Sequence, residues 1–296
     1  MRPLAPQDLD AVAAIDAELG GRARRAYFER RLCSAQRAPE QHLQLAADRD
    51  GALAGYMLGR ALEGEFGRSE PALRLEAFGV KREAQGRGLG AALSREFESA
   101  ARRAGASEIR TTAVWREHAL LRFLDHAGYR LADSHLLDCA LAGSNLTTAD
   151  DDPEIFVLEG HDVEGVARVD RRLTGRDRRG YLCRTIREAL ADSAVRMSLA
   201  ARVDGGVAGY LMARLDYGDF GRVEPTAVID TVGVDPLRAR QGIGRALLSQ
   251  LFVNLRGLGV ERVETVVAPD ALDLMAFFVR AGFRPSERLS FLKRLA

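Results

Sequence analysis

The chain has 296 residues, of which 47% are hydrophobic and 29% are charged, and its formal net charge is +1. This composition is typical of a soluble globular protein long enough for two domains. The balanced charge argues against a nucleic-acid partner and against binding to an anionic membrane.

The start of the chain lacks the apolar core of a signal peptide, and no apolar run is long enough to span a bilayer. Cys33, Cys139 and Cys183 are far apart and have no CxxC spacing or histidine cluster beside them. This pattern indicates reduced thiols and no metal site, as expected of a cytoplasmic protein.

The first half of the chain alternates helical and strand patterns. Residues 8–19 place apolar side chains on one helical face. Two strand-like runs within residues 43–60 surround Asp50-Gly51, a pair that favours a tight hairpin turn because both of its residues need a positive φ. The remaining pattern predicts strands over 73–80, 108–114 and 136–141, a long helix from Leu89, and a short helix that ends before Gly128.

The second half repeats the first with a constant shift of 154 positions, which carries Gly88 onto Gly242 and Gly128 onto Gly282. "GRARRAYF" falls on "GRDRRGYL", and "AGYMLGR" falls on "AGYLMAR". The repeat is domain-sized, so it predicts two similar domains, residues 1–143 and 154–296. The polar stretch 144–153, which ends in proline, is the predicted linker.

Glycines stand at every second position of "QGRGLG", residues 85–90, between a strand and a helix. They remove side chains from the turn, and the bare backbone N–H groups at a helix start favour an anion. The alternative is a turn that only permits tight packing. The spacing G-x-G-x-G departs from the G-x-G-x-x-G of a dinucleotide fold.

The order of elements around this loop resembles the GNAT acyltransferase family. The resemblance covers nearly all of both copies and implies an α/β fold with a mixed sheet in each of two tandem domains. In that family the loop Gln/Arg-x-x-Gly-x-Gly/Ala holds the pyrophosphate of acetyl-CoA. The first copy matches from Gln85 to Gly90, whereas the second has Ala239 in place of the Gln or Arg.

The resemblance assigns acetyl-CoA binding to two equivalent sets of residues. The strand ends would line the pantetheine arm, and the N–H of Val80 or Val234 would polarise the thioester carbonyl. A simple bulge is the alternative reading of Gly79 and Gly233. The sets are Phe78, Gly79, Val80, Gln85, Gly86, Arg87, Gly88, Leu89, Gly90 and Ala91, and Val232, Gly233, Val234, Arg240, Gln241, Gly242, Ile243, Gly244 and Arg245.

Acyl transfer to an amine requires removal of a proton, because a free ammonium has a pKa of about 10. Glu76 and Asp230 occupy equivalent positions, four residues before each strand-end valine. Even spacing predicts that each lies on the face of that valine, as a base or as a site for the ammonium. The alternative is a structural ion pair with an arginine.

A general acid is harder to identify. Many family members carry a Tyr four residues before the glycine of the last helix, where this chain has Leu124 and Phe278. The Asn that begins that helix in many members is replaced by Glu117 and Ala271. Water, another tyrosine, an unassisted thiolate or an inactive copy all remain open.

Arginines recur after the first helix of both copies. The resemblance to this family implies that this segment lines the acceptor site. Arginine forks bind carboxylate or phosphate, although a solvated helix face explains them equally well. Repeated glutamates in "FGRxEP" are further candidates, with a loop salt bridge as the alternative. The acceptor candidates are Arg22, Arg25, Glu70, Arg176, Arg179 and Glu224.

The sequence therefore predicts an acetyl-CoA-dependent N-acetyltransferase that acts on a primary amine of a small molecule or a protein, without a metal. One catalytic and one degenerate domain, or a non-catalytic CoA-sensing protein, are the alternatives. By analogy with single-domain relatives that dimerise, the chain is expected to be a monomer that mimics a dimer, or a homodimer.

Overall fold

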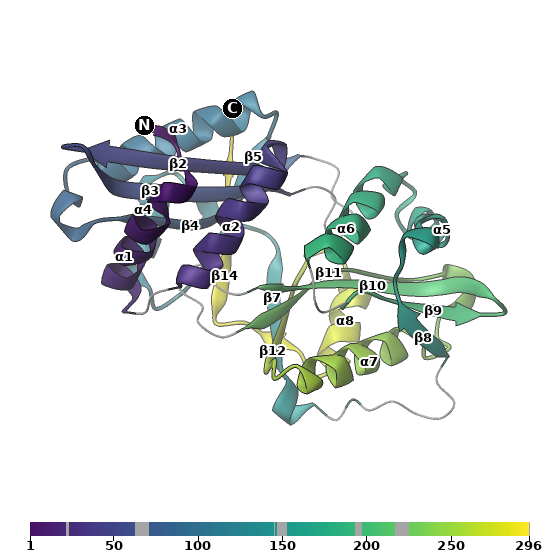
Figure 1. Cartoon of the computed structure of the whole chain (residues 1–296). Coiled ribbons are helices and arrows are strands. Elements are labelled where there is room, and N and C mark those ends of the chain that lie inside the picture. The colour runs from purple at the N-terminus through teal and green to yellow at the C-terminus, as the bar shows by residue number, and fades with distance from the viewer. Residues whose placement is uncertain are drawn as a thin grey trace.

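A computed structural model of the chain describes residues 1–21, 24–62, 71–144, 146, 153–192, 197–216 and 225–295. These residues form two seven-stranded mixed sheets, each covered by helices (Figure 1). In spatial order the first sheet contains β1 (Arg2–Pro3), β2 (His42–Arg49), β3 (Ala52–Leu62), β4 (Ala72–Val80), β5 (Glu108–Val114), β14 (Arg288–Arg294) and β6 (Arg130–Leu131). The second contains β13 (Arg284–Pro285), β7 (His135–Ala140), β12 (Arg262–Val267), β11 (Thr226–Val234), β10 (Gly206–Asp216), β9 (Leu199–Val203) and β8 (Glu154–Val157).

Within the described ranges, each copy supplies four α-helices to its own sheet. No described helix is both long and apolar enough to cross a membrane. The helices are α1 (Leu9–Gly20), α2 (Arg25–Arg37), α3 (Leu89–Arg103), α4 (His118–His126), α5 (Val163–Thr174), α6 (Arg179–Asp192), α7 (Ile243–Gly257) and α8 (Leu272–Arg280).

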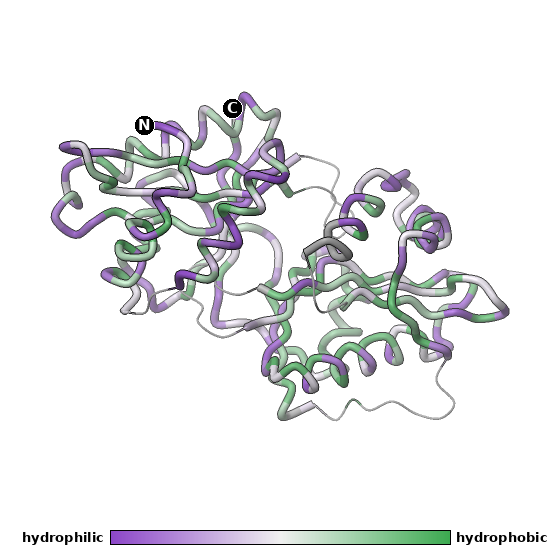
Figure 2. Tube along the Cα trace, viewed as in Figure 1, coloured by the Kyte–Doolittle hydropathy of each residue, from purple (hydrophilic) through white to green (hydrophobic). Residues whose placement is uncertain are grey.

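The helices divide each core into two layers. In the first copy, α1 and α2 bury Ile15 and Phe28 on one face of the sheet, while α3 buries Leu93 and Phe97 on the other. The second copy repeats this arrangement with α5 and α6 on one face and α7 with α8 on the other. Figure 2 shows hydrophobic residues along the central strands and hydrophilic residues along the outer helix α2.

The predicted hairpin turns are confirmed. Asp50 and Gly51 have φ values of 51° and 77°, and Asp204 and Gly205 have φ values of 52° and 75°. Both residues of each turn lie in the left-handed region, as a two-residue hairpin loop with the right-handed strand twist requires.

The last strand of each copy belongs to the sheet of the other copy. β14, from the end of the chain, pairs antiparallel with β5 from Arg288 opposite Val114 to Arg294 opposite Glu108. β7 pairs in the same way with β12 of the second sheet. In Figure 1 the yellow β14 lies in the purple and blue half, close to both termini. The predicted ranges 1–143 and 154–296 place these two strands with their own copies, so each sheet draws one strand from the other range. The proposed linker, 144–153, lies mostly outside the described residues.

A β-bulge in β4 corrects the prediction for Glu76. The pairing register shifts between Leu58 and Gly59 of β3, which leaves Glu76 as the extra residue. The bulge interrupts the alternation of side chains. Glu76 therefore faces α2, where its Oε1 lies 3.0 Å from Nη2 of Arg31, while Val80 packs with the α3 cluster on the other face. The expectation of a shared face was wrong.

The second copy contains the same bulge. The register shifts between Met212 and Ala213 of β10, so Asp230 is the extra residue of β11. Asp230 forms an ion pair with Arg214 of the neighbouring strand, whereas Val234 packs against the α7 core. The shared-face prediction fails here for the same physical reason.

Candidate functional site

The two parallel strands at the centre of each sheet separate partway along. Pairing between β4 and β5 runs only from Ala72–Glu108 to Arg74–Arg110. Beyond it the Thr111 hydroxyl donates to the carbonyl of Leu75 at 3.0 Å, in place of a ladder bond. Thr265 makes the equivalent bond to Ile229 at 3.2 Å. The remainder of each strand pair therefore borders a wedge-shaped opening in the sheet.

Backbone direction at the strand end gives this opening a hydrogen-bond donor. The N–H of Lys81 donates to Ala54 of β3 at 2.9 Å. Because successive N–H groups of a strand point to opposite edges, the N–H of Val80 points toward β5 and the opening. In the second copy the backbone N–H of Asp235 donates to the Ala208 carbonyl at 2.8 Å. The end of β11 is therefore oriented in the same way.

The glycine loop follows the strand end and is bound to it. Gly86 and Gly88 have φ values of 70° and 79°, in the left-handed region that glycine adopts without strain. α3 then begins at Leu89, and the first N–H groups of a helix have no intrahelical partner. The side chain of Gln85 donates to the Val80 carbonyl at 2.8 Å, so the loop lies directly beside the opening.

These elements border one cavity of about 960 Å³ in the first copy. Nine of the ten residues predicted there to bind acetyl-CoA line it, and Arg87 is the exception. The nine are Phe78, Gly79, Val80, Gln85, Gly86, Gly88, Leu89, Gly90 and Ala91. Other walls come from α1 and the residues after it, from α4, and from the exchanged strand β14, which contributes Lys293.

One end of the cavity is polar. The ammonium of Lys293 donates to Glu98 Oε1 of α3 and to the Ala127 carbonyl after α4, at 2.6 Å each. Ser94 donates to the same Glu98 oxygen at 3.0 Å. His126 also lines this end. The exchanged strand thus joins the two helices that flank the cavity.

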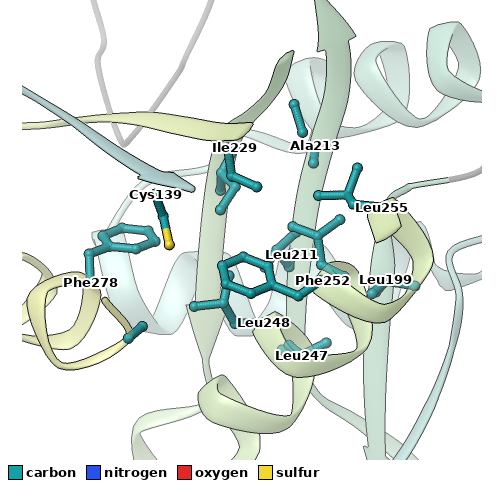
Figure 3. Close-up of a cluster of buried hydrophobic side chains, with 14 of the residues drawn as sticks. Cys139, Leu199, Leu211, Ala213, Ile229, Leu247, Leu248, Phe252, Leu255 and Phe278 are labelled. Atoms are coloured by element: carbon teal, nitrogen blue, oxygen red, sulfur yellow. The ribbon is translucent and has the colours of Figure 1, made fainter. Parts of the chain in front are cut away.

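The second copy fills the equivalent space with hydrophobic side chains. Leu248, Phe252 and Cys139 occupy the positions of Ser94, Glu98 and Lys293 after the shift of 154. They are at most 3% exposed and pack with Phe278 between α7 and α8 (Figure 3).

The second glycine loop also departs from the first. Arg240 occupies the position of Gly86 with a φ of 63°, a conformation that costs a non-glycine residue about 1–2 kcal/mol. Ala239 cannot make the side-chain bond that Gln85 makes. Gly242 keeps a φ of 80° at the start of α7. Gln241 and Arg245 are exposed, and Ile243 is buried.

The predicted catalytic carboxylates lie outside the large cavity. Glu76 is 3% exposed and paired with Arg31, and it is not among the residues that line the cavity. Asp230 lines a separate cavity of about 100 Å³ between the two sheets, together with Arg74 and Arg110 of the first copy. The ion pairs of both carboxylates favour the structural alternative considered for them.

The predicted acceptor arginines lie on the surface. Arg25 pairs with Asp10, Arg179 donates to Glu164 at 2.7 Å, and Arg176 is exposed. Arg22, Glu70 and Glu224 lie outside the described residues.

A buried triad that the sequence reasoning missed contributes to the cavity wall. Arg24 forms an ion pair with Asp16, and both residues line the cavity. The Tyr56 hydroxyl donates to Asp16 at 3.4 Å. Burial, together with the nearby Asp16 charge, raises the pKa of Tyr56 far above its ordinary value, so this phenol stays neutral.

The sequence carried a signal for this triad. The shift of 154 takes its members to Asp170, Arg178 and Tyr210, which form the same contacts. Lys293 and Glu117, which also line the cavity, had no such signal, because Cys139 and Ala271 stand at their equivalent positions.

Comparison with curated proteins finds relatives over a limited stretch. Mycothiol acetyltransferase of Clavibacter sepedonicus is 36% identical over 110 residues, which are 37% of this chain and 34% of that protein. Mycothiol acetyltransferase of Clavibacter michiganensis subsp. michiganensis is 34% identical over 110 residues, 37% of this chain and 33% of that protein. The match thus spans about a third of the length of these relatives.

Solved structures share the fold over the whole chain. A tandem GNAT protein from the clavulanic acid biosynthesis pathway superposes with a TM-score of 0.68 at 19% identity, covering 99% of this chain and 98% of that one. A GCN5-related glucosamine N-acetyltransferase region of a fungal multi-domain GH3 enzyme gives 0.68 at 17% identity, covering 98% and 37%.

The family model described as acetyltransferase (GNAT) family matches this sequence twice, over residues 10–129 and 167–283. The matched segments fall one in each copy and together span most of the chain, and the mixed α/β architecture agrees with the tandem GNAT structure. The chain therefore belongs to the acetyltransferase (GNAT) family and carries two GNAT domains in tandem.

Proposed function

We propose that the chain is an N-acetyltransferase that takes the acetyl group from acetyl-CoA and transfers it to a primary amine of a small molecule or a protein. The observation that carries the proposal is the cavity of about 960 Å³ in the first copy. The end of β4, the glycine loop and the start of α3 all line this cavity.

The loop supplies the anion site. The backbone N–H groups from Gly86 to Ala91 stand at the start of α3, where the helix dipole carries about half a positive charge. Gly88 leaves open space, because a Cβ there would have no atom within 4 Å. A pyrophosphate can therefore approach the backbone closely.

The opening between β4 and β5 would hold the thioester. The N–H of Val80 points into this opening and would donate to the carbonyl oxygen of the acetyl group. That oxygen becomes an oxyanion when the amine attacks, so a fixed donor stabilises the transition state more than the ground state. No metal is needed for this chemistry.

We propose that the first copy holds the acetyl-CoA and that the second serves mainly as structure. Gln85 and Gly86 support the loop of the first copy, whereas Ala239 and Arg240 replace them in the second. The hydrophobic side chains between α7 and α8 also fill the space that is polar and open in the first copy.

Calorimetric titration of the whole chain with acetyl-CoA tests the proposal. We expect one site per chain, weakened by Gly88→Ala and retained in Gly242→Ala. These two variants form a matched pair, because both glycines have φ values near 80° and open surroundings. Strain alone therefore affects both equally, and only a bound phosphate separates them.

Turnover is measured as thiol release from acetyl-CoA with a panel of primary amines: ethanolamine, glucosamine, an amino-acid ester and a lysine peptide. Two equal binding sites would contradict the assignment to one copy. Absence of binding would contradict the enzyme itself, and binding without turnover of any amine would favour the CoA-sensing alternative.

Two expectations about the protein in the cell accompany this proposal. Cys33, Cys139 and Cys183 are free, as expected of a chain in a reducing cytoplasm. The exchanged strands complete both sheets within one chain, which supports a monomer over a homodimer.

The surface arginines Arg25, Arg176 and Arg179 stay predictions for the acceptor site.

A further inference from the structure

The cavity of the first copy requires a proton acceptor, and three described carboxylates line it: Asp16, Glu98 and Glu117. Two of them are already engaged. Asp16 is paired with Arg24, and Glu98 is held by Lys293 and Ser94. Among the described residues, the Glu117 carboxylate has neither an ion pair nor a side-chain hydrogen bond.

The fold fixes Glu117 at the mouth of the wedge. Its backbone N–H donates to the Val114 carbonyl at 2.9 Å, so Glu117 closes a turn three positions after the end of β5. It precedes the first turn of α4. It borders the same cavity as Phe78 and Gly79 of the facing strand β4, which is where an acetyl group bound by the Val80 N–H would lie.

Two positive charges and the cavity walls set the proton affinity of this carboxyl. Glu117 is exposed at the edge of the cavity, but the protein atoms around its carboxyl still remove part of its solvation. This raises the pKa of Glu117 above its ordinary value, while the charges of Arg288 and Arg24 oppose the rise. Arg24 follows α1, and Arg288 belongs to the exchanged strand, where its guanidinium donates to Thr112. A carboxyl with a raised pKa accepts an amine proton more readily than an ordinary one.

The position at which many family members carry a tyrosine acid has no ionisable side chain in the first copy. Leu124 occupies that position and is fully buried. Glu76, the candidate from the sequence, points to Arg31 on the face opposite Val80.

We propose that Glu117 is the catalytic base of the first copy, taking the proton from the acceptor ammonium. This inference rests on the proposed function. Ala271 occupies the equivalent place in the second copy, so the assignment also places catalysis in the first copy alone.

The reaction balances without a further reactant. Glu117 accepts one proton from the ammonium, directly or through a water, and the freed lone pair attacks the thioester carbon. The C–N bond forms and the C=O π electrons move to the oxygen, which the Val80 N–H stabilises. Collapse of this intermediate breaks the C–S bond. The nitrogen passes its second proton to the leaving thiolate, and Glu117 later releases the first proton to solvent.

The test compares wild type, Glu117→Gln and Glu287→Gln in the thiol-release assay with the same four amines, from pH 5 to pH 9. Glu287→Gln is a matched control because it makes the same chemical change next to Arg288 in the sequence. The Glu287 side chain is 69% exposed and does not line the cavity. Binding of acetyl-CoA to each protein is measured by calorimetry.

We expect Glu117→Gln to lower kcat by about 10²–10⁴-fold, with acetyl-CoA affinity within about twofold of wild type. The inflection that the Glu117 carboxyl adds to the wild-type pH profile should be lost in this variant, which leaves only the dependence of the rate on the fraction of free amine. Glu287→Gln should match wild type. A raised KM for the amine with unchanged kcat would overturn the proposal, because Glu117 would then only hold the ammonium.

Wild-type turnover in Glu117→Gln would overturn the assignment while leaving the proposed function standing. If wild type acetylates none of the amines, both the proposed function and this assignment fail together.

Discussion

Replacing Lys293 by Met should destabilise the first copy through a contact made near the end of the chain. Lys293 donates to Glu98 and to the Ala127 carbonyl. Met keeps the length and the apolar stem of the side chain but removes the charge. Glu98 would then retain only Ser94 as a donor from the present cluster, inside a wall where its side chain is 11% exposed.

The magnitude follows from what is left unpaired. Removing one partner of a buried ion pair costs about 3–5 kcal/mol, because the other charge stays buried without compensation. The Lys293 side chain is 21% exposed, so water reaches part of the site. We therefore expect a loss of about 2–3 kcal/mol in the free energy of unfolding.

A second substitution distinguishes this cause from a simple loss of packing. Lys293→Met combined with Glu98→Met removes both charges and keeps the volume, which is commonly neutral or stabilising. The second copy provides a natural precedent, since Cys139 and Phe252 occupy these two positions in a well-packed core. The double variant should recover most of the lost stability.

Urea unfolding of wild type, both single variants and the double variant measures the coupling energy. We expect a coupling of about 2 kcal/mol between the two substitutions. Additive effects within about 0.5 kcal/mol would refute the argument, because they would show that the two side chains do not stabilise each other.

Three further predictions concern single sites. Gln85→Ala should weaken acetyl-CoA binding about 2–10-fold by calorimetry, since it removes one hydrogen bond worth about 0.5–1.5 kcal/mol. Burial and two positive neighbours, Arg60 and Arg31, lower the pKa of His42 to about 4. As pH falls from about 7 to 4, the unfolded chain therefore takes up this proton before the folded chain does, and the free energy of unfolding should drop by up to about 3 kcal/mol. His42→Leu should reduce that drop in urea titrations. Gly59→Ala should cost about 1–3 kcal/mol in thermal or urea unfolding, because its Cβ would stand within 3.0 Å of an aromatic ring of α3.

The sequence was sufficient for the family, the repeat and the position of the loop. Hairpin turns at Asp50-Gly51 and Asp204-Gly205 follow from local backbone preference, and the glycines at 86 and 88 have the positive φ values that their residue type suggests. Each of these features is decided within a few neighbouring residues.

The face of Glu76 could not be predicted in the same way. An alternating pattern assumes an uninterrupted strand, whereas one extra residue reverses the faces on either side of it. Its ion pair with Arg31 likewise depends on how α2 packs against the sheet, which the local pattern does not encode.

Strand exchange lay beyond the sequence pattern for a different reason. β7 and β14 are equivalent in the two copies, so either one satisfies the hydrophobic pattern of either sheet. The partner of each is decided by how the whole chain packs. Contacts that result from the exchange, such as the one between Lys293 and Glu98, join residues separated by 195 positions.

The exchanged strand also determines when the first domain can be completed during synthesis. β5 ends at Val114, but β14, which pairs with it, begins only at Arg288. Ribosomes add about 5–20 residues per second, so β5 lacks the native partner of this edge for roughly 10–35 s. An unpaired strand edge can recruit other chains. The fraction of the protein that reaches the native state should therefore depend on translation speed and on chaperones that shield this edge, and a chain truncated before Arg288 should leave the cavity-bearing domain unfinished.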